Sequence, residues 1–193
     1  FQAVLEIGAA LSSARDLDDL LKRVIDRIAN LLGADAATLF MLDGERDELW
    51  SRVLKGSTLK EIRVPADRGI AGHVVRTGEP VVIPDAYEDR RFNPEVDRLS
   101  GFRTRSIIAA PLRHVSGRLL GVVELLHRRV DAFSRDDVHI LGAVAAQIAG
   151  VLDNVLLMEQ LREQNLALRS AQQDLSEAVR ELDVLFELEK AMS

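Results

Sequence analysis

Residues 61–74 read EIRVPADRGIAGHV, and three further blocks follow in order: IPDAY at 83–87, RFNP at 91–94 and GFRTRS at 101–106. The first block opens on alternating polar and apolar residues, which indicates a short strand at 61–64 that ends in a Pro-Ala-Asp turn. The second block continues into Glu88, and Asp85 followed three residues later by Glu is the pattern of a capping box that opens a short helix. These four blocks are the most specific pattern in the chain.

Around these blocks the apolar residues recur with a period of two, which is typical of strands that bury one face. We expect six strands, at residues 37–43, 48–54, 61–64, 81–83, 106–112 and 119–127. Residues 1–32 instead show helical spacing in two pieces, of which the second begins at a cap at Asp16 and ends at Gly33. Short strands enclosed by terminal helices predict an α+β fold with an antiparallel sheet.

The C-terminal part of the chain is expected to form one long helix. The 43 residues from Val151 onward contain neither Gly nor Pro, and Ser134 is a suitable cap for the helix start. A heptad repeat places leucine at residues 161, 168, 175 and 182, with Asn165 at the alternate core position. This pattern predicts a parallel two-stranded coiled coil and therefore a homodimer. A long helix that lies against its own domain is the alternative.

These features divide the chain into three parts. We expect a dimerisation or linker helix at residues 1–15, a globular domain at residues 16–150 and a coiled-coil helix at residues 151–193. Residues 1–12 also align with residues 182–193, which suggests that the long helix leads toward a second copy of the domain or toward an output domain. Chance similarity between two amphipathic helices is the alternative.

The composition excludes several classes of function. The 193 residues carry 31 acidic against 25 basic side chains, and a net charge of −6 argues against nucleic acid as a partner, because that needs a basic surface. The absence of Cys excludes disulfides, thiolate metal sites and a thiol nucleophile, and it predicts a reducing, cytoplasmic location. No apolar run approaches the ~20 residues that cross a bilayer, so we expect no membrane segment.

The sequence gives no positive sign of a catalytic apparatus. The four histidines, at residues 73, 114, 127 and 139, are isolated and lack the spacing of a metal site, although haem ligation by one of them stays open. The Gly69–Gly72 stretch lacks the Lys and the Ser or Thr of a P-loop, and no Ser lies in a nucleophile elbow. We therefore expect neither a metal site nor an enzyme within this chain.

The four blocks strongly resemble those of GAF domains, and the resemblance extends over roughly residues 16–160. It implies a six-stranded antiparallel sheet, with dimerising terminal helices on one face and a small-molecule pocket on the other. The sequence is most similar to the GAF domains that bind cyclic nucleotides in phosphodiesterases and in cyanobacterial-type adenylate cyclases. Residues 16–150 are accordingly interpreted as a GAF sensor domain.

The resemblance also implies where a ligand binds. The candidate ligand-binding residues are Thr38, Leu54, Lys55, Ile70, Asp85, Ala86, Phe92, Asn93, Ser100, Arg103, Thr104 and Glu124. Hydroxyl groups, an aliphatic face and a carboxylate acceptor together suit a purine nucleotide. Free amides at the start of the short helix after Asp85 would receive the cyclic phosphate. The alternative is that Asp85 merely caps this helix and that Glu124 pairs with a neighbouring Arg.

Departures from the family pattern bear on the ligand and on signalling. Leu54-Lys55 stands where cGMP-binding relatives place an aromatic residue and a carboxylate, and Lys only donates hydrogen bonds, so cAMP is favoured over cGMP. Asn93 replaces a family tyrosine. An ion pair between Arg128 and Asp137 is expected to take the place of the family's Lys–Asp bridge and to fasten the last strand to the long helix.

Five arginines make the segment from residue 90 to residue 105 locally basic in an acidic protein. Such a segment favours a phosphate or another anion, unless its charges are paired with the acidic residues among them. The sequence thus predicts a regulatory GAF module of a bacterial-type signal transduction protein, which senses a cyclic nucleotide and signals through a dimeric coiled coil to a cyclase, kinase, phosphatase or phosphodiesterase domain. A ligandless dimerisation spacer, in which Phe92, Phe102 and Ile107 fill the cavity, is the alternative.

Overall fold

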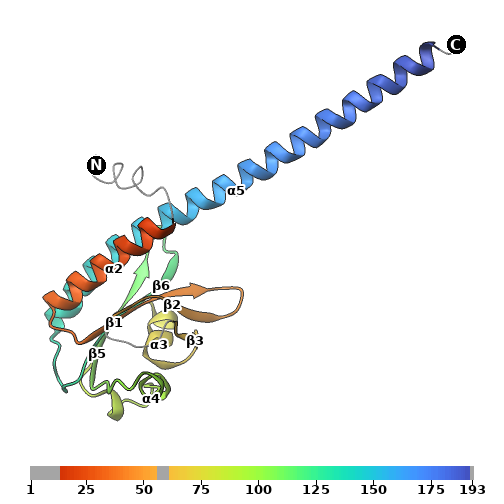
Figure 1. The fold of residues 1–193 in the computed structure, drawn as a ribbon. Coiled ribbons are helices and arrows are strands. Elements are labelled where there is room, and N and C mark those ends of the chain that lie inside the picture. The colour runs from red at the N-terminus through yellow and green to blue at the C-terminus, as the bar shows by residue number, and fades with distance from the viewer. Residues whose placement is uncertain (1–13, 56–60, 192–193) are drawn as a thin grey trace. The chain divides into compact units, whose positions relative to one another are not determined.

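The computed structural model describes residues 14–55 and 61–191 (Figure 1). Its strands are β1 (Ala36–Asp43), β2 (Glu48–Lys55), β3 (Arg63–Pro65), β4 (Val81–Ile83), β5 (Ser106–Arg113) and β6 (Leu119–His127). Its helices are α2 (Ala14–Leu31), α3 (Gly69–Thr77), the 3-10 turn η1 (Ala86–Glu88), α4 (Glu95–Ser100) and α5 (Arg135–Ala191). The first helix was expected at residues 1–15, of which residues 1–13 lie outside the described residues.

The strands form one antiparallel sheet in the order β3-β2-β1-β6-β5-β4, which confirms the predicted fold. The predicted strand boundaries agree with the structure to within one residue except at β3. There the Ile62 amide donates to Ser51 Oγ at 2.7 Å, and the Ile62 carbonyl accepts from the Ser51 amide at 2.8 Å. Because the Ile62 amide bonds to a side chain and not to a backbone carbonyl of β2, β3 begins at Arg63 rather than at Glu61.

The sheet is covered on both faces (Figure 1). In this domain α2 and the first turns of α5 lie side by side over one face, and α3 and α4 lie over the other. Since side chains alternate along a strand, neighbouring residues of β1 enter different cores. Phe40 packs in one cluster with Ile70 and Val74 of α3. The adjacent Leu39 is fully buried on the opposite face.

Two glycines shape the ends of α2 and α3, and one predicted helix cap is wrong. Gly33 has a φ of 67° and ends α2 in the left-handed conformation, as predicted. A Cβ on Gly72 would lie 2.9 Å from the carbonyl oxygen of Ala66, so glycine lets α3 approach the turn that precedes it. Asp16 lies inside α2, and the predicted cap at this residue is therefore wrong.

The start of α5 is held by a local cap, and the ion pair expected to fasten it to the last strand does not form. Ser134 Oγ accepts from the Asp137 amide at 3.2 Å and the Asp137 carboxylate accepts from the Ser134 amide at 2.7 Å, which confirms the predicted cap. The expected ion pair between Arg128 and Asp137 is wrong, because this carboxylate is engaged in the cap and the Arg128 guanidinium lies 4.5 Å over the ring of Phe102.

A buried carboxylate instead connects α5 to the hairpin of β5 and β6. Asp153 is only 4% exposed, and its two oxygens lie 3.2 Å from Arg118 Nη1 and 3.3 Å from His114 Nδ1. Both partners stand at the turn between β5 and β6. This cluster had no signal in the sequence, because Asp153 is 35 or more residues away from both partners.

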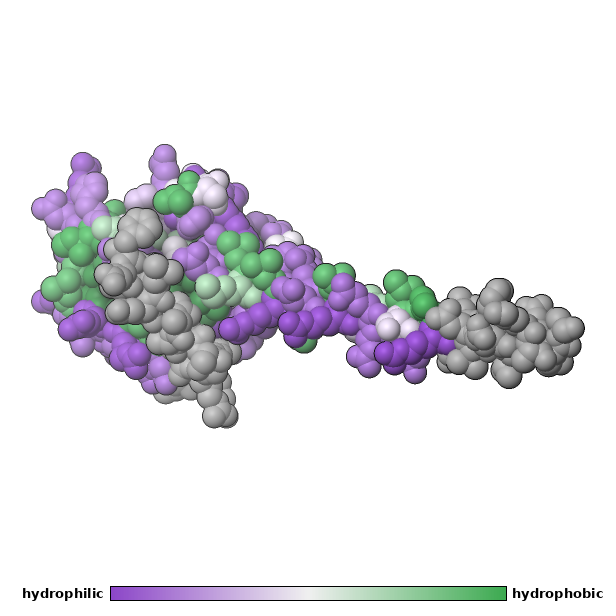
Figure 2. Space-filling view, turned by 90° about the horizontal axis from the view of Figure 1, so that it is seen from above, coloured by the Kyte–Doolittle hydropathy of each residue, from purple (hydrophilic) through white to green (hydrophobic). Residues whose placement is uncertain are grey.

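The chain divides into two units after Asp153, and the helix from Asn154 onward is described by itself. Its apolar side chains at the heptad positions that the structure describes are about half exposed, among them Met158, Leu161, Leu168 and Leu175. Green patches interrupt the purple surface of this helix in Figure 2. The Asn165 side chain donates to the Leu161 carbonyl at 2.8 Å. The side chain of Leu182 lies outside the described residues.

The helix α5 corrects one expectation from the sequence. It contains an 18-residue window with a mean hydropathy of 1.8, which by length and composition is apolar enough to cross a membrane. The expectation that no apolar run approaches this length was therefore too strong. One third of the window is buried, and residues such as Leu141, Ile148 and Leu152 recur at helical spacing in the core of the domain. Burial along one stripe is typical of an amphipathic helix that packs one face against a core.

Candidate ligand-binding pocket

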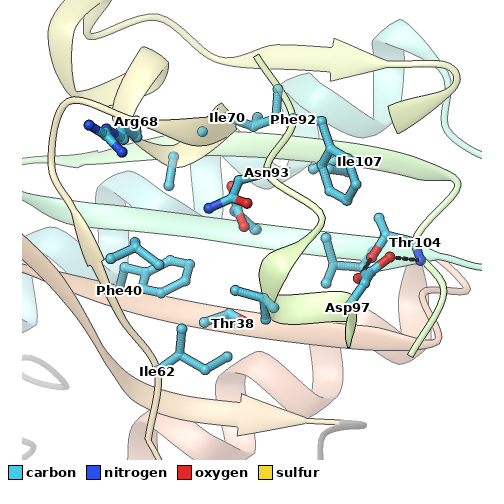
Figure 3. A pocket seen from close by; sticks show the side chains of 16 residues that line it. Thr38, Phe40, Ile62, Arg68, Ile70, Phe92, Asn93, Asp97, Thr104 and Ile107 are labelled. Carbon is cyan, nitrogen blue, oxygen red and sulfur yellow. Dashed lines mark hydrogen bonds between the residues drawn. The ribbon is translucent and has the colours of Figure 1, made fainter. Parts of the chain in front are cut away.

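A cavity of about 80 Å³ lies between the sheet and the segments that cover it on the α3 side (Figure 3). Thr38 and Phe40 of β1, Ile107 of β5, and Glu124 and Leu126 of β6 form its floor. Arg68 and the first turn of α3 form one wall, and residues from Phe92 to Asp97 form another. The lining thus draws on three of the four sequence blocks and on α4, and the floor comes from the central strands.

Two polar side chains meet at the floor of the cavity. Thr38 stands opposite Glu124 in the antiparallel pairing of β1 with β6, so the two residues share the cavity face of the sheet. The Glu124 carboxylate accepts a hydrogen bond from the Ala71 amide of α3. Burial nevertheless raises the pKa of Glu124 from 4.5 to about 7, because one backbone donor does not replace the water that the charged form loses. Glu124 is therefore able to accept or to donate a hydrogen bond near neutral pH.

A second buried carboxylate closes the wall opposite Arg68. Asp97 of α4 accepts from the Thr104 amide and from the Thr104 hydroxyl, each at 2.7 Å (Figure 3). It also accepts from the Tyr87 hydroxyl at 3.1 Å, and burial together with this bond raises the pKa of Tyr87. The bonds from Thr104 hold α4 against the segment before β5, and the bond from Tyr87 holds it against η1, so Asp97 fixes the position of the wall.

The remaining lining of the cavity is largely apolar. Phe40, Ile62, Ile70 and Ile107 surround the two polar floor residues. Phe92 enters from the segment before α4, and its ring centroid lies 5.2 Å from that of Tyr87. The volume of the cavity is below the ~300 Å³ at which sites for drug-sized ligands begin. A nucleotide-sized ligand therefore requires that a wall moves.

The structure brings half of the candidate residues together and places the others elsewhere. Those that line the cavity are Thr38, Ile70, Phe92, Asn93, Thr104 and Glu124. Figure 3 shows Asn93 directed toward the centre of the cavity. Of the residues expected to fill the cavity in a ligandless spacer, Phe92 and Ile107 line it, and Phe102 is buried outside it.

Leu54 and Lys55 point to different sides of the sheet. Leu54 pairs with Thr38 across β1 and β2 and packs against the core on the cavity side. Lys55 Nζ donates to Asn30 Oδ1 at 2.6 Å, on α2 at the other face. The donors of Lys55 therefore do not face a base in the cavity, and the preference for cAMP over cGMP has no contact there that supports it.

The residues around η1 are engaged within the protein. Asp85 caps the turn through the Tyr87 amide at 3.2 Å, and its salt bridge with Arg105 lowers the pKa of this carboxyl. Ala86 is fully buried, and its amide donates to the Arg105 carbonyl at 2.6 Å. The expectation of free amides at the start of this helix is therefore wrong, because a cap and a tertiary bond occupy them.

Ser100 and Arg103 also stand outside the cavity. Ser100 Oγ accepts from the Phe102 amide at 3.2 Å at the end of α4. The Arg103 guanidinium lies 5.3 Å from the centroid of the Tyr87 ring. Conversely, sequence reasoning missed Arg68 and Asp97 as lining residues. Arg68 was visible within the first block, whereas Asp97 shows its role only through Thr104, seven residues away across a loop.

No cluster of three potential metal ligands occurs within residues 14–55 and 61–191. Comparison with known proteins identifies the fold. The sequence model of the GAF domain matches residues 16–152. Among solved structures, the GAF domain of a phosphoenolpyruvate-protein phosphotransferase from Coxiella burnetii superposes with a TM-score of 0.68 at 21% identity, covering 82% of this chain and 95% of that one.

Two curated relatives are more similar in sequence. The chain is 32% identical over 177 residues, 82% of its length, to the Drosophila melanogaster protein named dual 3',5'-cyclic-AMP and -GMP phosphodiesterase 11. It is 32% identical over 150 residues, 71% of its length, to the Takifugu rubripes protein named dual 3',5'-cyclic-AMP and -GMP phosphodiesterase 11A. It spans 12% and 17% of the lengths of these relatives. The family match and these identities show that the chain belongs to the GAF family.

Proposed function

We propose that this domain is a regulatory sensor whose cavity binds a small molecule, with a 3',5'-cyclic nucleotide as the first candidate. The observation that carries the proposal is Glu124, a carboxyl group in the centre of the sheet that faces a cavity and has no ion pair within the described part of the chain. An ionisable group that lines a cavity and has a strongly shifted pKa marks a candidate functional site. The names of the two phosphodiesterase relatives support a cyclic nucleotide as the ligand class.

The chemistry of the cavity suits a purine nucleoside. The Glu124 carboxyl, with the Thr38 hydroxyl beside it, offers hydrogen bonds to an amino or hydroxyl group at the floor. Ile70 and Phe92 offer apolar surfaces for a planar base. Asn93 supplies both a donor and an acceptor at the wall. Since no contact in the cavity separates adenine from guanine, cAMP and cGMP are both to be tested, and cAMP remains the sequence-based preference.

Binding of such a ligand is coupled to movement, because the cavity is smaller than a nucleotide. Three side-chain hydrogen bonds hold the wall formed by α4, and all three converge on Asp97, so this one residue controls whether the wall moves. A ligand that displaces this wall shifts the equilibrium between a closed and an open form of the domain. We place the sensing step in this displacement.

Transmission follows from the position of β6. This strand carries Glu124, and His127 at its end is followed within eight residues by the start of α5. The buried cluster of Asp153, His114 and Arg118 joins α5 to the other end of β6. We propose that the heptad leucines pair two chains in a coiled coil and carry the change toward an output domain, in a cytoplasmic protein.

The test is isothermal titration of the purified chain with cAMP and with cGMP. The wild type is expected to bind at least one of them, and Glu124→Gln is expected to weaken binding by about tenfold, as expected for the loss of a hydrogen bond to a charged group. Glu45→Gln, in the turn between β1 and β2, is the matched control and should bind as the wild type does. Absence of binding by the wild type to either nucleotide overturns the proposal and favours the ligandless spacer.

A further inference from the structure

A second hollow of about 450 Å³ opens beside the cavity and is strongly basic. We name it the arginine groove; it is lined by Arg68, Arg76, Arg90 and Arg91, by the acidic residues Asp67 and Glu95, and by Gly69, Phe92, Asn93 and Pro94. Four positive charges thus stand against two negative ones in a protein whose net charge is −6. Such a local reversal of sign concentrates anions.

Two of the four arginines are already engaged. Arg91 forms a two-pronged pair with Asp89, with distances of 2.9 and 2.6 Å. Arg76 donates to the Asp67 carbonyl. The side chains of Arg68 and Arg90, in contrast, have no ion pair or hydrogen bond among residues 14–55 and 61–180. One arginine of the groove is thus paired with a carboxylate and one with a backbone carbonyl, which leaves the guanidinium groups of Arg68 and Arg90 at the groove.

The pKa of a neighbouring residue is shifted in the direction that a positive potential favours. His73 lies one helical turn before Arg76, and burial lowers its pKa. Arg91 and Arg76 lower the pKa further, and Asp89 opposes them. The charges around this side of α3 therefore add up to a positive field even where the protein supplies a carboxylate.

The arginine groove adjoins the cavity. Arg68, Gly69, Phe92 and Asn93 line both. Figure 3 shows Arg68 at one end of the cavity, with Asp97 and Thr104 at the other. A molecule whose uncharged part lies on Glu124 can therefore extend past Asn93 and present a charged group to the groove.

We propose that the arginine groove is a phosphate-binding subsite, which receives an exocyclic phosphate or diphosphate of a ligand whose other end occupies the cavity. Two guanidinium forks suit a phosphate that carries two charges, since each fork matches a pair of phosphate oxygens. A cyclic phosphodiester carries a single charge and uses this arrangement incompletely. The inference rests on the proposed function only in that a nucleoside occupies the cavity. It ranks a nucleotide with an exocyclic phosphate above a 3',5'-cyclic nucleotide as the ligand.

The experiment compares the wild type with the double variant Arg68→Gln/Arg90→Gln and with the control Arg98→Gln. Arg98 stands on α4 close by but does not line the groove, so the control removes a charge without touching the subsite. All three side chains are exposed, and thermal melting checks that each variant remains folded. Inorganic pyrophosphate, adenosine, cAMP and ADP are titrated at about 50 mM and about 200 mM salt, because exposed charges are screened over this range.

The wild type and Arg98→Gln are expected to bind pyrophosphate more tightly at the lower salt concentration, and the double variant should bind it at least about tenfold more weakly. ADP should bind the wild type more tightly than adenosine and cAMP do, and the double variant should lose this advantage. Equal affinity of all three proteins for pyrophosphate and ADP overturns the subsite. Binding of pyrophosphate that depends on Arg68 and Arg90, together with no binding of adenosine, cAMP or ADP, retains the subsite and overturns the nucleotide as the ligand of the cavity.

Discussion

Asp97 accepts two hydrogen bonds of 2.7 Å from the same residue, one from the amide and one from the hydroxyl of Thr104. Both oxygens of this buried carboxylate are thereby used, with Tyr87 as a third donor. The arrangement ties α4 to the strand that follows it. Since α4 forms a wall of the cavity, the same bonds determine how readily the cavity opens.

The substitution Asp97→Asn should loosen this wall. The amide of the new side chain presents one acceptor and one donor, so one of the Thr104 donors loses its partner, at a cost of about 1–3 kcal/mol. The midpoint of thermal unfolding should fall, and hydrogen exchange at the Thr104 amide should accelerate. Glu95→Gln, an exposed change on the same helix, is the control. Unchanged hydrogen exchange at the Thr104 amide in the Asp97→Asn variant would show that Asp97 does not hold the wall in this way.

The raised pKa of Glu124 predicts that stability falls as the pH rises toward neutrality. The folded form keeps the proton up to a pKa of about 7, whereas the unfolded chain releases it near 4.5, so the folded form binds more protons between these values. Stability is therefore fully present below about pH 4.5 and is lost progressively up to about pH 7, by about 2–3 kcal/mol from this group. Urea unfolding of the wild type and of Glu124→Gln at a series of pH values measures the difference. Parallel curves for the two proteins would show that Glu124 does not titrate in this way.

Asp153→Asn tests the junction between the β5–β6 turn and α5. The substitution removes the charge that pairs with Arg118 and His114, and leaves a buried amide near two donors. Because Arg118 is half exposed, the loss should be moderate, about 1–2 kcal/mol of unfolding free energy. Denaturant unfolding measures it, with Asp136→Asn in the exposed first turn of α5 as the control. The substitution should also weaken the effect of ligand binding on α5. The change in distance between spin labels placed on either side of residue 153 would measure this loss.

The heptad predicts that Leu168 and Leu166 differ although both are exposed in the single chain. Leu168 occupies a core position of the predicted coiled coil, and Leu166 does not. Leu168→Glu should therefore convert a dimer to a monomer in light scattering at micromolar concentration, and Leu166→Glu should leave the dimer intact. A monomeric wild type, or equal effects of the two substitutions, would remove the coiled coil from the proposal.

The strands could be located from sequence as short apolar runs between turn residues. Both faces of β1 and β5 are buried, but successive side chains still alternate between the two faces of the sheet. The same rule explains where the prediction of the site failed. Leu54 and Lys55 are neighbours on a strand, so only one of them can face the cavity, and pairing with Thr38 selects Leu54. Treating the two residues as one recognition motif ignored this alternation.

The contacts that shape the cavity lie beyond any local pattern. Ala86 donates to Arg105, and Asp97 accepts from Thr104, across segments whose path depends on the packed core. Ser134 showed the opposite case: its place at the start of the long helix predicted the cap correctly, and Asp137 completes that cap. The ion pair expected with Arg128 was excluded by that same cap, because a carboxylate engaged locally has little left for a distant partner.

The central position of Glu124 sets two goals of protein engineering against each other. A carboxyl buried in the middle of a sheet is the kind of group that a designer replaces with Leu or Gln to make a domain more robust. In this domain such a replacement would raise the thermal stability at neutral pH and would remove the carboxyl group from the floor of the cavity. Robust variants of this domain are therefore expected to be poor detectors.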